Sequence, residues 1–388
     1  MNPAVMPTYG RTDVQFVRGE GAWLIDHHGE RYLDALSGLG VVALGHANEA
    51  IALALTHQSQ NLLHTSNLYR IPGQERLAER LAVISGMDNM FFGNSGAEAC
   101  ECAIKIARLY GHNKGFSDPT IIVAESAFHG RTMATLTATG NRKVQAGFEP
   151  LVSGFLRVPF NDVPAIEKIA ETANQVTAIF VEPIQGEGGI QVPDPTYLPR
   201  LRALCDANDW LLIVDEVQSG NARTGAYFCY QHSGILSDLV TTAKGLGNGV
   251  PIGVCLARGA AAEVFKPGNH GSTFGGNPLS CAAANAVLDE FERLNLIQHA
   301  AEMGDYIQAQ FRSHLAGDNR VRDIRGMGLM IGVQLTKPCT ELIQQAFERK
   351  LLLNVTADSV IRLLPPLIIN QSEADLIVGT VCDLIKQI

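Results

Sequence analysis

The amino-acid sequence predicts an α/β protein with a mostly parallel, doubly wound sheet, and three observations indicate that fold. Strand-like apolar runs alternate with helical runs between residues 88 and 260, which is the signature of consecutive βαβ units. The apolar run 210–214 ends in two carboxylates, as a buried strand does where open α/β sheets place their ligands. Hydrophobic residues make up 46% of the 388 residues and charged residues 18%, which suits a large core and excludes disorder.

The individual elements follow from apolar periodicity in chain order. Residues 13–45 are expected to form short strands and turns, with a hairpin across 23–34, and amphipathic helices are expected at 47–62 and 73–85. In the alternating region, the expected strands are 90–92, 120–124, 178–181, 211–214, 239–242 and 253–257, and the expected helices are 97–111, 163–173 and 196–208. After it come helices 278–294 and 297–315, strands near 321–325, 329–335, 351–354 and 360–363, and a closing helix at 372–387.

The pattern changes near residue 290, where the alternation of strands and helices stops. We therefore place a domain boundary there, with a large domain at 46–290 and a small one at 291–388. No internal repeat or long linker interrupts either part.

Composition excludes several classes of function. The net charge is −9 and no basic cluster occurs, which argues against a nucleic-acid partner. No window approaches the roughly 20 apolar residues that a membrane helix needs, and the N-terminus does not have the pattern of a signal peptide. The eight cysteines show no paired spacing, so we expect buried, reduced thiols in a cytoplasmic protein and no metal site.

The sharpest candidate residues are Asp215 and Lys244, which follow neighbouring apolar runs. A carboxylate at the end of a buried strand needs a partner, either a structural cation or a protonated ring nitrogen of a ligand. Lys244 has uncharged flanks from residue 239 to 253 and glycines directly after it. An apolar setting lowers the pKa of a lysine and suits it to Schiff-base chemistry, whereas the plainer alternative is a snorkelling lysine at a strand end.

Two further segments suit anion binding at the start of a helix. The segment 92–98 follows a strand and places Ser95, Gly96 and Ala97 at a helix N-terminus, where free N–H groups can hold a phosphate. The segment 272–278, with Ser272 and Thr273, precedes the long helix and suits a second grip on an oxyanion. Taken alone, each also fits an ordinary capped helix start.

Three more features complete the candidate site. In the segment 128–132, Phe128 could stack on a ring and Arg131 could bind a carboxylate, although a loop with a surface arginine fits equally well. Glu182 and Glu187 lie in a Gly/Pro-rich turn after a strand, where paired carboxylates tune the charge of a site or merely cap a solvated turn. Arg362 lies in an apolar strand and must find an anion, from the protein or from a substrate.

Together and in this order, the segments resemble the ornithine/GABA subgroup of class-III pyridoxal-phosphate (PLP) aminotransferases. The resemblance covers essentially the whole chain. The motifs that carry it are SGAEA from residue 95, FHGRT from 128, VEPIQGEGG from 181, DEVQSG-x-x-RTG from 215, AKGLG-x-GVPIG from 243 and STFGGNP from 272.

The resemblance implies the PLP fold-type I, in which residues 1–45 contribute to the small domain, and a homodimer with shared active sites. It implies that Lys244 carries the cofactor as a Schiff base and then shuttles a proton, while Asp215 pairs with the pyridinium nitrogen. The other implied cofactor contacts are Phe128 and Val217 on the two ring faces, Gln218 at the ring hydroxyl, Ser95, Gly96 and Ala97 at the phosphate, Glu182 beside the ring, and Thr273 reaching the phosphate of the other subunit.

For the substrates, the resemblance implies that Arg131, with Ser272 nearby, binds the carboxylate remote from the reacting amine. Arg362 would bind the α-carboxylate of 2-oxoglutarate, and Glu187 would neutralise Arg362 when the donor has no carboxylate there. The implied reaction moves the terminal amino group of N2-acetylornithine to 2-oxoglutarate, giving N-acetylglutamate 5-semialdehyde and glutamate, a step of arginine biosynthesis.

Several alternatives stay open at this point. Related enzymes use succinylornithine, succinyl-diaminopimelate, ornithine or GABA as donors. A nicotinamide-dependent oxidoreductase fits the α/β pattern but would need a GxGxxG segment after the first strand and would give Lys244 no task. A non-catalytic homologue would not need the full set of charged residues. Asn221, Ala222 and Asn248 depart from the family pattern, which bears on loop geometry and substrate preference.

Overall fold

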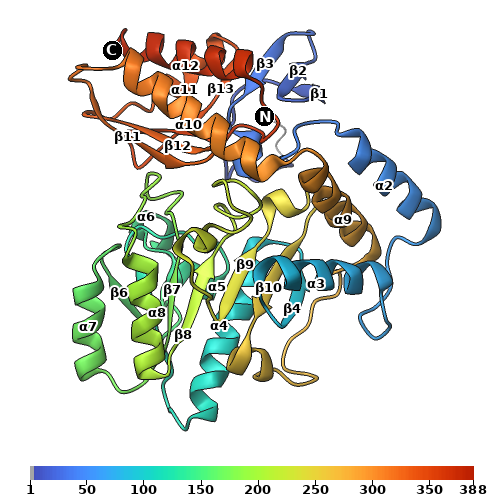
Figure 1. Ribbon diagram of the computed structural model, residues 1–388, viewed down its shortest axis with the longest axis vertical. Coiled ribbons are helices and arrows are strands. Elements are labelled where there is room, and N and C mark those ends of the chain that lie inside the picture. Colours follow the sequence, from blue (N-terminus) through green and yellow to red (C-terminus); the bar gives the residue numbers. More distant parts are fainter. Residues whose placement is uncertain (1–3) are drawn as a thin grey trace.

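The computed structural model describes residues 4–388, which form three β-sheets with helices packed around them (Figure 1). The largest sheet has seven strands in the order β4-β10-β9-β8-β7-β5-β6. All its strands run in parallel except β10, which is antiparallel to both β4 and β9, so the predicted mostly parallel sheet is confirmed. The strands are β4 (Asn89–Gly93), β10 (Gly253–Ala257), β9 (Leu239–Thr242), β8 (Leu211–Asp215), β7 (Val176–Val181), β5 (Thr120–Ala124) and β6 (Phe155–Val158).

The central strands of this sheet are buried on both faces. Every residue of β7, β8, β9 and β10 is buried, which explains why they appear in the sequence as continuous apolar runs rather than alternating ones. Helix α4 (Gly96–Asn113) packs across strands β4, β5 and β7 to β10, while α8 (Tyr197–Asn208) packs on β7 and β8, with α7 (Val163–Thr172) beside it. Residues 155–158, which form β6, are not among the strands expected from periodicity.

The two smaller sheets lie together above the large one in Figure 1. The first has the order β1-β2-β3-β13 and contains the expected hairpin as β2 and β3. The second is antiparallel, with the order β11-β12-β15-β14. Their strands are β1 (Phe16–Glu20), β2 (Trp23–Asp26), β3 (Arg31–Asp34), β13 (Leu351–Leu352), β11 (Val321–Met327), β12 (Met330–Leu335), β15 (Val360–Leu363) and β14 (Asn354–Thr356).

The strand expected at 351–354 is wrong as a single element. Its first two residues form β13, which pairs in parallel with β3, whereas β14 begins at Asn354 and pairs with β15. The chain therefore changes sheets at Leu353, a break that an unbroken apolar run does not reveal. Helices α10 (Leu296–His314), α11 (Leu342–Glu348) and α12 (Gln371–Ile385) accompany these sheets.

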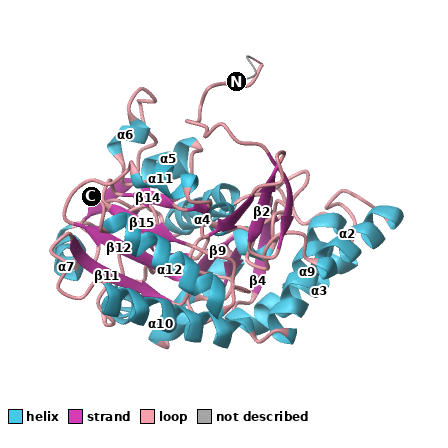
Figure 2. Ribbon diagram, turned by 90° about the horizontal axis from the view of Figure 1, so that it is seen from above, coloured by secondary structure: helices cyan, strands magenta, loops and turns pink. Residues whose placement is uncertain are grey.

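A further helical group, α2 (Glu49–Asn61), α3 (Pro72–Ser85) and α9 (Pro278–Arg293), lies on one side of the molecule, far from α7 (Figure 2). The short helices are α1 (Ser37–Gly40), α5 (Met133–Ala138) and α6 (Arg142–Gln145), and the 3-10 turns are η1 (Cys229–Ser233), η2 (Lys244–Leu246) and η3 (Gly259–Glu263). The proposed domain boundary at 290 lies within α9, and the division 1–45, 46–290 and 291–388 stays a prediction. None of the helices in residues 4–388 has both the length and the apolarity of a membrane span.

Candidate active site

Parallel strands end at one edge of the large sheet, and the loops that follow them enclose a cavity of about 450 Å³. Loops after β4, β5, β7, β8 and β9 all contribute to its lining. The sequence-predicted residues that line it are Ser95, Gly96, Ala97, Phe128, Arg131, Glu182, Asp215, Val217, Gln218 and Lys244. The fold therefore brings together side chains that are spread over more than a third of the chain.

Lys244 opens the turn η2, with Ala243 between it and the end of β9, and is half-buried. Burial lowers the pKa of its amine, and the nearby Arg362 guanidinium lowers it further, while the carboxylate of Glu187 acts in the opposite direction. A lysine in such surroundings gives up its proton more readily than a solvated one, so it is available as a nucleophile.

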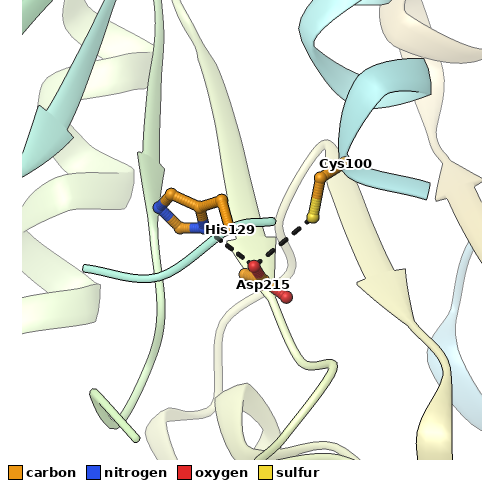
Figure 3. A group of neighbouring side chains, drawn as sticks. All are labelled: Cys100, His129 and Asp215. Atoms are coloured by element: carbon orange, nitrogen blue, oxygen red, sulfur yellow. Dashed lines mark hydrogen bonds and ion pairs between the residues drawn. The ribbon is translucent and has the colours of Figure 1, made fainter. Parts of the chain in front are cut away.

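Asp215 ends β8 and is buried, with hydrogen-bond donors around both carboxylate oxygens. Figure 3 shows the two partners of one oxygen, His129 and Cys100. Oδ2 lies 2.7 Å from Nδ1 of His129 and accepts the thiol of Cys100 at 3.4 Å. Oδ1 accepts the hydroxyl of Thr241 at 3.0 Å and the N–H of Val217 at 3.1 Å. These donors hold the carboxylate in one orientation at the wall of the cavity.

Cys100, His129 and Asp215 offer ligand-type atoms within 4.8 Å of one another. Burial raises the pKa of the Cys100 thiol well above its usual value, and the charge of Asp215 raises it further. Metal coordination needs the thiolate, whereas a protonated thiol is suited to donating to the carboxylate. We therefore interpret the cluster as hydrogen-bonded support for Asp215 and not as a metal centre.

His129 and Cys100 were not predicted from the sequence as residues of the site. His129 lies within the segment 128–132, stacks on Phe180 with ring centroids 3.9 Å apart, and contacts Asp215 from a loop 86 positions earlier. Cys100 lies four residues after Gly96 on α4, so the two share one face of that helix. That helical spacing is the one signal that could have placed Cys100 near Asp215.

Glu182 follows β7 and is buried beside the cavity. Burial raises the pKa of its carboxyl to about 7, although the nearby His129 partly offsets the rise. Its two oxygens accept the N–H groups of Phe128 at 2.9 Å and Gly186 at 3.0 Å. Glu182 thus fixes the loop that carries Phe128 and Arg131.

One end of the cavity is built from the first turn of α4. The N–H groups of Gly96 and Ala97 belong to that turn, where no earlier helical carbonyl is available to them. Backbone packing is tight here, since a Cβ at Gly96 would lie 2.7 Å from the Val217 side chain and one at Gly253 would lie 2.0 Å from the Ser95 carbonyl. The arrangement suits an anion bound to the helix N-terminus.

Arg362 lies just behind the cavity wall with a side chain that is 1% exposed. Its Nη1 donates to Oε1 of Glu187 at 2.5 Å and to Gln218, which lines the cavity, at 3.2 Å. Its Nε donates to Asn354 at 3.1 Å. Arg131 lines the cavity itself, with its guanidinium carbon 5.5 Å from the ring centroid of Phe128. One arginine, Arg131, therefore lines the cavity from a loop, and a second, Arg362, contacts its lining from a strand.

Ser272 and Thr273 are not brought to the cavity in the same way. The Ser272 hydroxyl accepts the amide of Asn94, a lining residue, at 3.2 Å, so it lies one contact away. Thr273 is exposed and is not among the lining residues within the described part of the chain. The next residue, Phe274, is also exposed.

Comparison with known proteins gives concordant matches. The family model described as Aminotransferase class-III matches residues 5–385. An acetylornithine aminotransferase of Nitrosomonas europaea is 55% identical over 381 residues, covering 98% of this chain and 97% of that protein. Among solved structures, an ornithine aminotransferase of Toxoplasma gondii has a TM-score of 0.95 at 32% identity, covering 99% of this chain and 93% of that one. An acetylornithine aminotransferase of Elizabethkingia anophelis has a TM-score of 0.87 at 32% identity, with coverage of 98% and 96%.

Proposed function

The chain belongs to the class-III aminotransferase family, and on that premise we propose that it is a PLP-dependent aminotransferase whose cofactor occupies the cavity at the edge of the large sheet. The observation that carries the proposal is the pairing of Lys244 and Asp215 in one cavity. One is a lysine with a lowered pKa and the other a buried carboxylate supplied with donors.

The residues present fit such a cofactor. The first turn of α4 offers N–H groups for a phosphate, and Phe128 and Val217 offer apolar walls for a flat ring. Asp215 offers a negative charge for a protonated ring nitrogen, and Lys244 offers an amine for an aldehyde carbon. A lysine that merely extended from a strand end into solvent would not need an anion site, apolar walls and a carboxylate in the same cavity.

When bound, the cofactor supplies an electron-withdrawing ring and carries the amino group between two half-reactions. Lys244 would bind the cofactor covalently at rest and move a proton at the substrate carbon during each half-reaction. Asp215 would hold the proton on the ring nitrogen, and its hydrogen bonds with His129 and Thr241 would keep its carboxylate oriented.

The proposed donor is N2-acetylornithine and the proposed acceptor 2-oxoglutarate. A relative that is 55% identical over nearly the whole chain carries the name acetylornithine aminotransferase, which supports this donor over succinylornithine, succinyl-diaminopimelate, ornithine or GABA. Arg131 would bind the donor's remote carboxylate and Arg362 the α-carboxylate of the acceptor, with Glu187 neutralising Arg362 between them. The reaction would serve arginine biosynthesis.

We also propose a homodimer with shared sites. The segments 62–69 and 272–275, which carry large exposed apolar side chains, lie side by side. Asn67 donates to the carbonyls of Ser272 and Gly275, and the rings of His64 and Phe274 are 5.3 Å apart. The exposed side chains are Leu62, Leu63, Leu68, Tyr69 and Phe274. A second copy covering this surface would shield them and would bring Thr273 to the phosphate end of the partner's cavity. The eight free, buried thiols suit a reducing compartment, so we propose the cytoplasm as its location.

Absorbance and covalent trapping test the cofactor assignment. The purified protein should absorb in the visible range and lose that band on borohydride reduction, with the adduct mapped to Lys244. Lys244→Ala should abolish turnover while the molar mass from light scattering remains that of a dimer. A colourless wild-type protein without a lysine adduct, even after incubation with PLP, would contradict the assignment and revive the oxidoreductase alternative.

A panel of donors assayed against 2-oxoglutarate tests the substrate. We expect the highest specificity constant for N2-acetylornithine. A higher constant for ornithine or GABA would contradict the proposed donor while leaving the cofactor assignment intact.

A further inference from the structure

Lys244 has an unusual backbone conformation. Its φ is +45°, in the left-handed region that residues with a Cβ rarely adopt, and Ala243 before it has φ −166° and ψ −139°. Such a conformation persists only where the surrounding structure holds it in place. The direction of the Lys244 side chain therefore depends on whatever fixes the peptide group between Ala243 and Lys244.

Asn221 makes that contact. Its side chain is buried, and its amide nitrogen donates both to the carbonyl of Ala243 and to the hydroxyl of Thr242, each at 3.0 Å. Its amide oxygen accepts the hydroxyl of Tyr227 at 3.2 Å. Both N–H donors and the oxygen of one amide are thus committed, and two of the three bonds end on the residues directly before Lys244.

Asn221 also packs against Gly245, the residue that follows Lys244. A Cβ placed on Gly245 would lie 3.1 Å from the Cβ of Asn221, so the asparagine packs against the residue that follows Lys244. Its own backbone is held by a tight turn, in which Asn221 and Ala222 have φ of 56° and 65° and the N–H of Arg223 bonds to the Gly220 carbonyl at 3.4 Å. Asparagine tolerates this conformation better than most residues.

We propose that Asn221 is a positioning residue for Lys244: it fixes the Ala243 carbonyl and thereby directs the lysine side chain into the cavity. The inference rests on the proposed function, since it assigns to Lys244 the covalent attachment of the cofactor. Without the amide, the strained backbone at Lys244 can relax, and the amine spends less time at the reacting carbon. Substrate contacts through Arg131 and Arg362 do not involve Asn221, so the loss falls on kcat and on cofactor attachment rather than on KM.

The test compares Asn221→Ala with a matched control, Asn285→Ala. Asn285 is also a buried asparagine whose amide nitrogen donates to two acceptors, the carbonyls of Gly73 and Cys281, but it lies on α9 and does not line the cavity. Each holoenzyme is assayed for kcat and KM, for the dissociation constant of PLP by equilibrium dialysis, and for the amount of Lys244 adduct after brief borohydride reduction.

For Asn221→Ala we expect kcat to fall about tenfold or more and the PLP dissociation constant to rise by a similar factor, with KM values within about threefold of wild type. Both variants should lose thermal stability, and Asn285→Ala should keep wild-type kcat and adduct yield. Equal changes in the two variants, or a wild-type adduct yield in Asn221→Ala, would overturn the inference.

If Asn221→Ala does not fold, Asn221→Asp provides the same test. It keeps the size of the side chain and its acceptor for Tyr227, but it replaces the donor to Ala243 with an acceptor. We expect the same loss of kcat and adduct yield, and wild-type values would overturn the inference. Failure of the proposed function is distinguishable, because wild-type protein would then form no Lys244 adduct at all.

Discussion

Replacing Glu187 by alanine separates the two half-reactions that one cavity must accommodate. The change removes the carboxylate that lies 2.5 Å from Nη1 of Arg362. Arg362 is then left with the neutral acceptors Gln218 and Asn354. In the proposed reaction, a donor that reacts at a terminal carbon would bring no carboxylate to Arg362, whereas glutamate and 2-oxoglutarate would.

The size of the effect follows from the burial of the two partners. Removing one member of a fully buried ion pair costs about 3–5 kcal/mol because the other charge is left uncompensated. Arg362 is 1% exposed but Glu187 is 39% exposed, so water can replace part of the lost interaction. We therefore take about half the full penalty, about 1.5–2.5 kcal/mol, which slows the donor half-reaction roughly 10- to 70-fold. The glutamate half-reaction should change by no more than about twofold, since its α-carboxylate replaces the missing charge.

Single-turnover absorbance measurements resolve the two half-reactions separately. The enzyme is mixed with N2-acetylornithine in one series and with glutamate in the other, and the rate of loss of the cofactor band is recorded. Glu187→Gln serves as the graded control, because it keeps a hydrogen-bond acceptor and should lose less than Glu187→Ala. Equal losses in the two series, or a larger loss with glutamate, would refute the assigned role of the pair.

Three other changes give separate tests. Burial raises the pKa of Glu216 to about 7, so the folded state binds its proton more tightly than the unfolded chain does, and the contribution of Glu216 to stability falls as pH rises from about 4.5 to 7. In Glu216→Gln, the urea-unfolding free energy should therefore be less unfavourably affected by that rise in pH than in wild type, and parallel curves for the two proteins would contradict this. Arg131→Gln should raise KM roughly 10- to 100-fold for a donor with a remote carboxylate and far less for a simple terminal amine. Similar KM changes for both donors would contradict the proposal that Arg131 binds the remote carboxylate. His129→Phe removes the side chain whose Nδ1 lies 2.7 Å from Oδ2 of Asp215. Steady-state kinetics and dialysis should show kcat lowered about tenfold and PLP binding weakened, with KM unchanged. Unchanged kcat and PLP affinity would mean that the histidine only packs against Phe180.

The sequence carried enough information to place the main candidates at one edge of the sheet. Asp215 and Glu182 each end or follow a continuous apolar run, and parallel strands must bring their C-terminal ends to the same side. The pairing of His129 with Asp215 could not be predicted in this way, because it depends on the path of an irregular loop. Likewise, nothing local marks Leu353 as the point where the chain leaves one sheet for another. Which sheet each part of the segment 351–356 joins depends on the partner strands that the folded protein offers, β3 for β13 and β15 for β14.

The strand pairing between β3 and β13 has a consequence for biosynthesis. It joins Leu33 to Leu351, so one edge of β3 has no partner until almost the whole chain has left the ribosome, while the other edge pairs with the neighbouring strand β2. At about 5–20 residues per second, that interval lasts on the order of 15–60 s. Lys244 emerges well before Arg362, so a nascent or truncated chain would carry the lysine proposed to bind the cofactor without the arginine proposed to bind the acceptor. Long-range closure of this kind is slow, and Arg362 can reach Gln218 at the cavity wall only after almost the whole chain has been made.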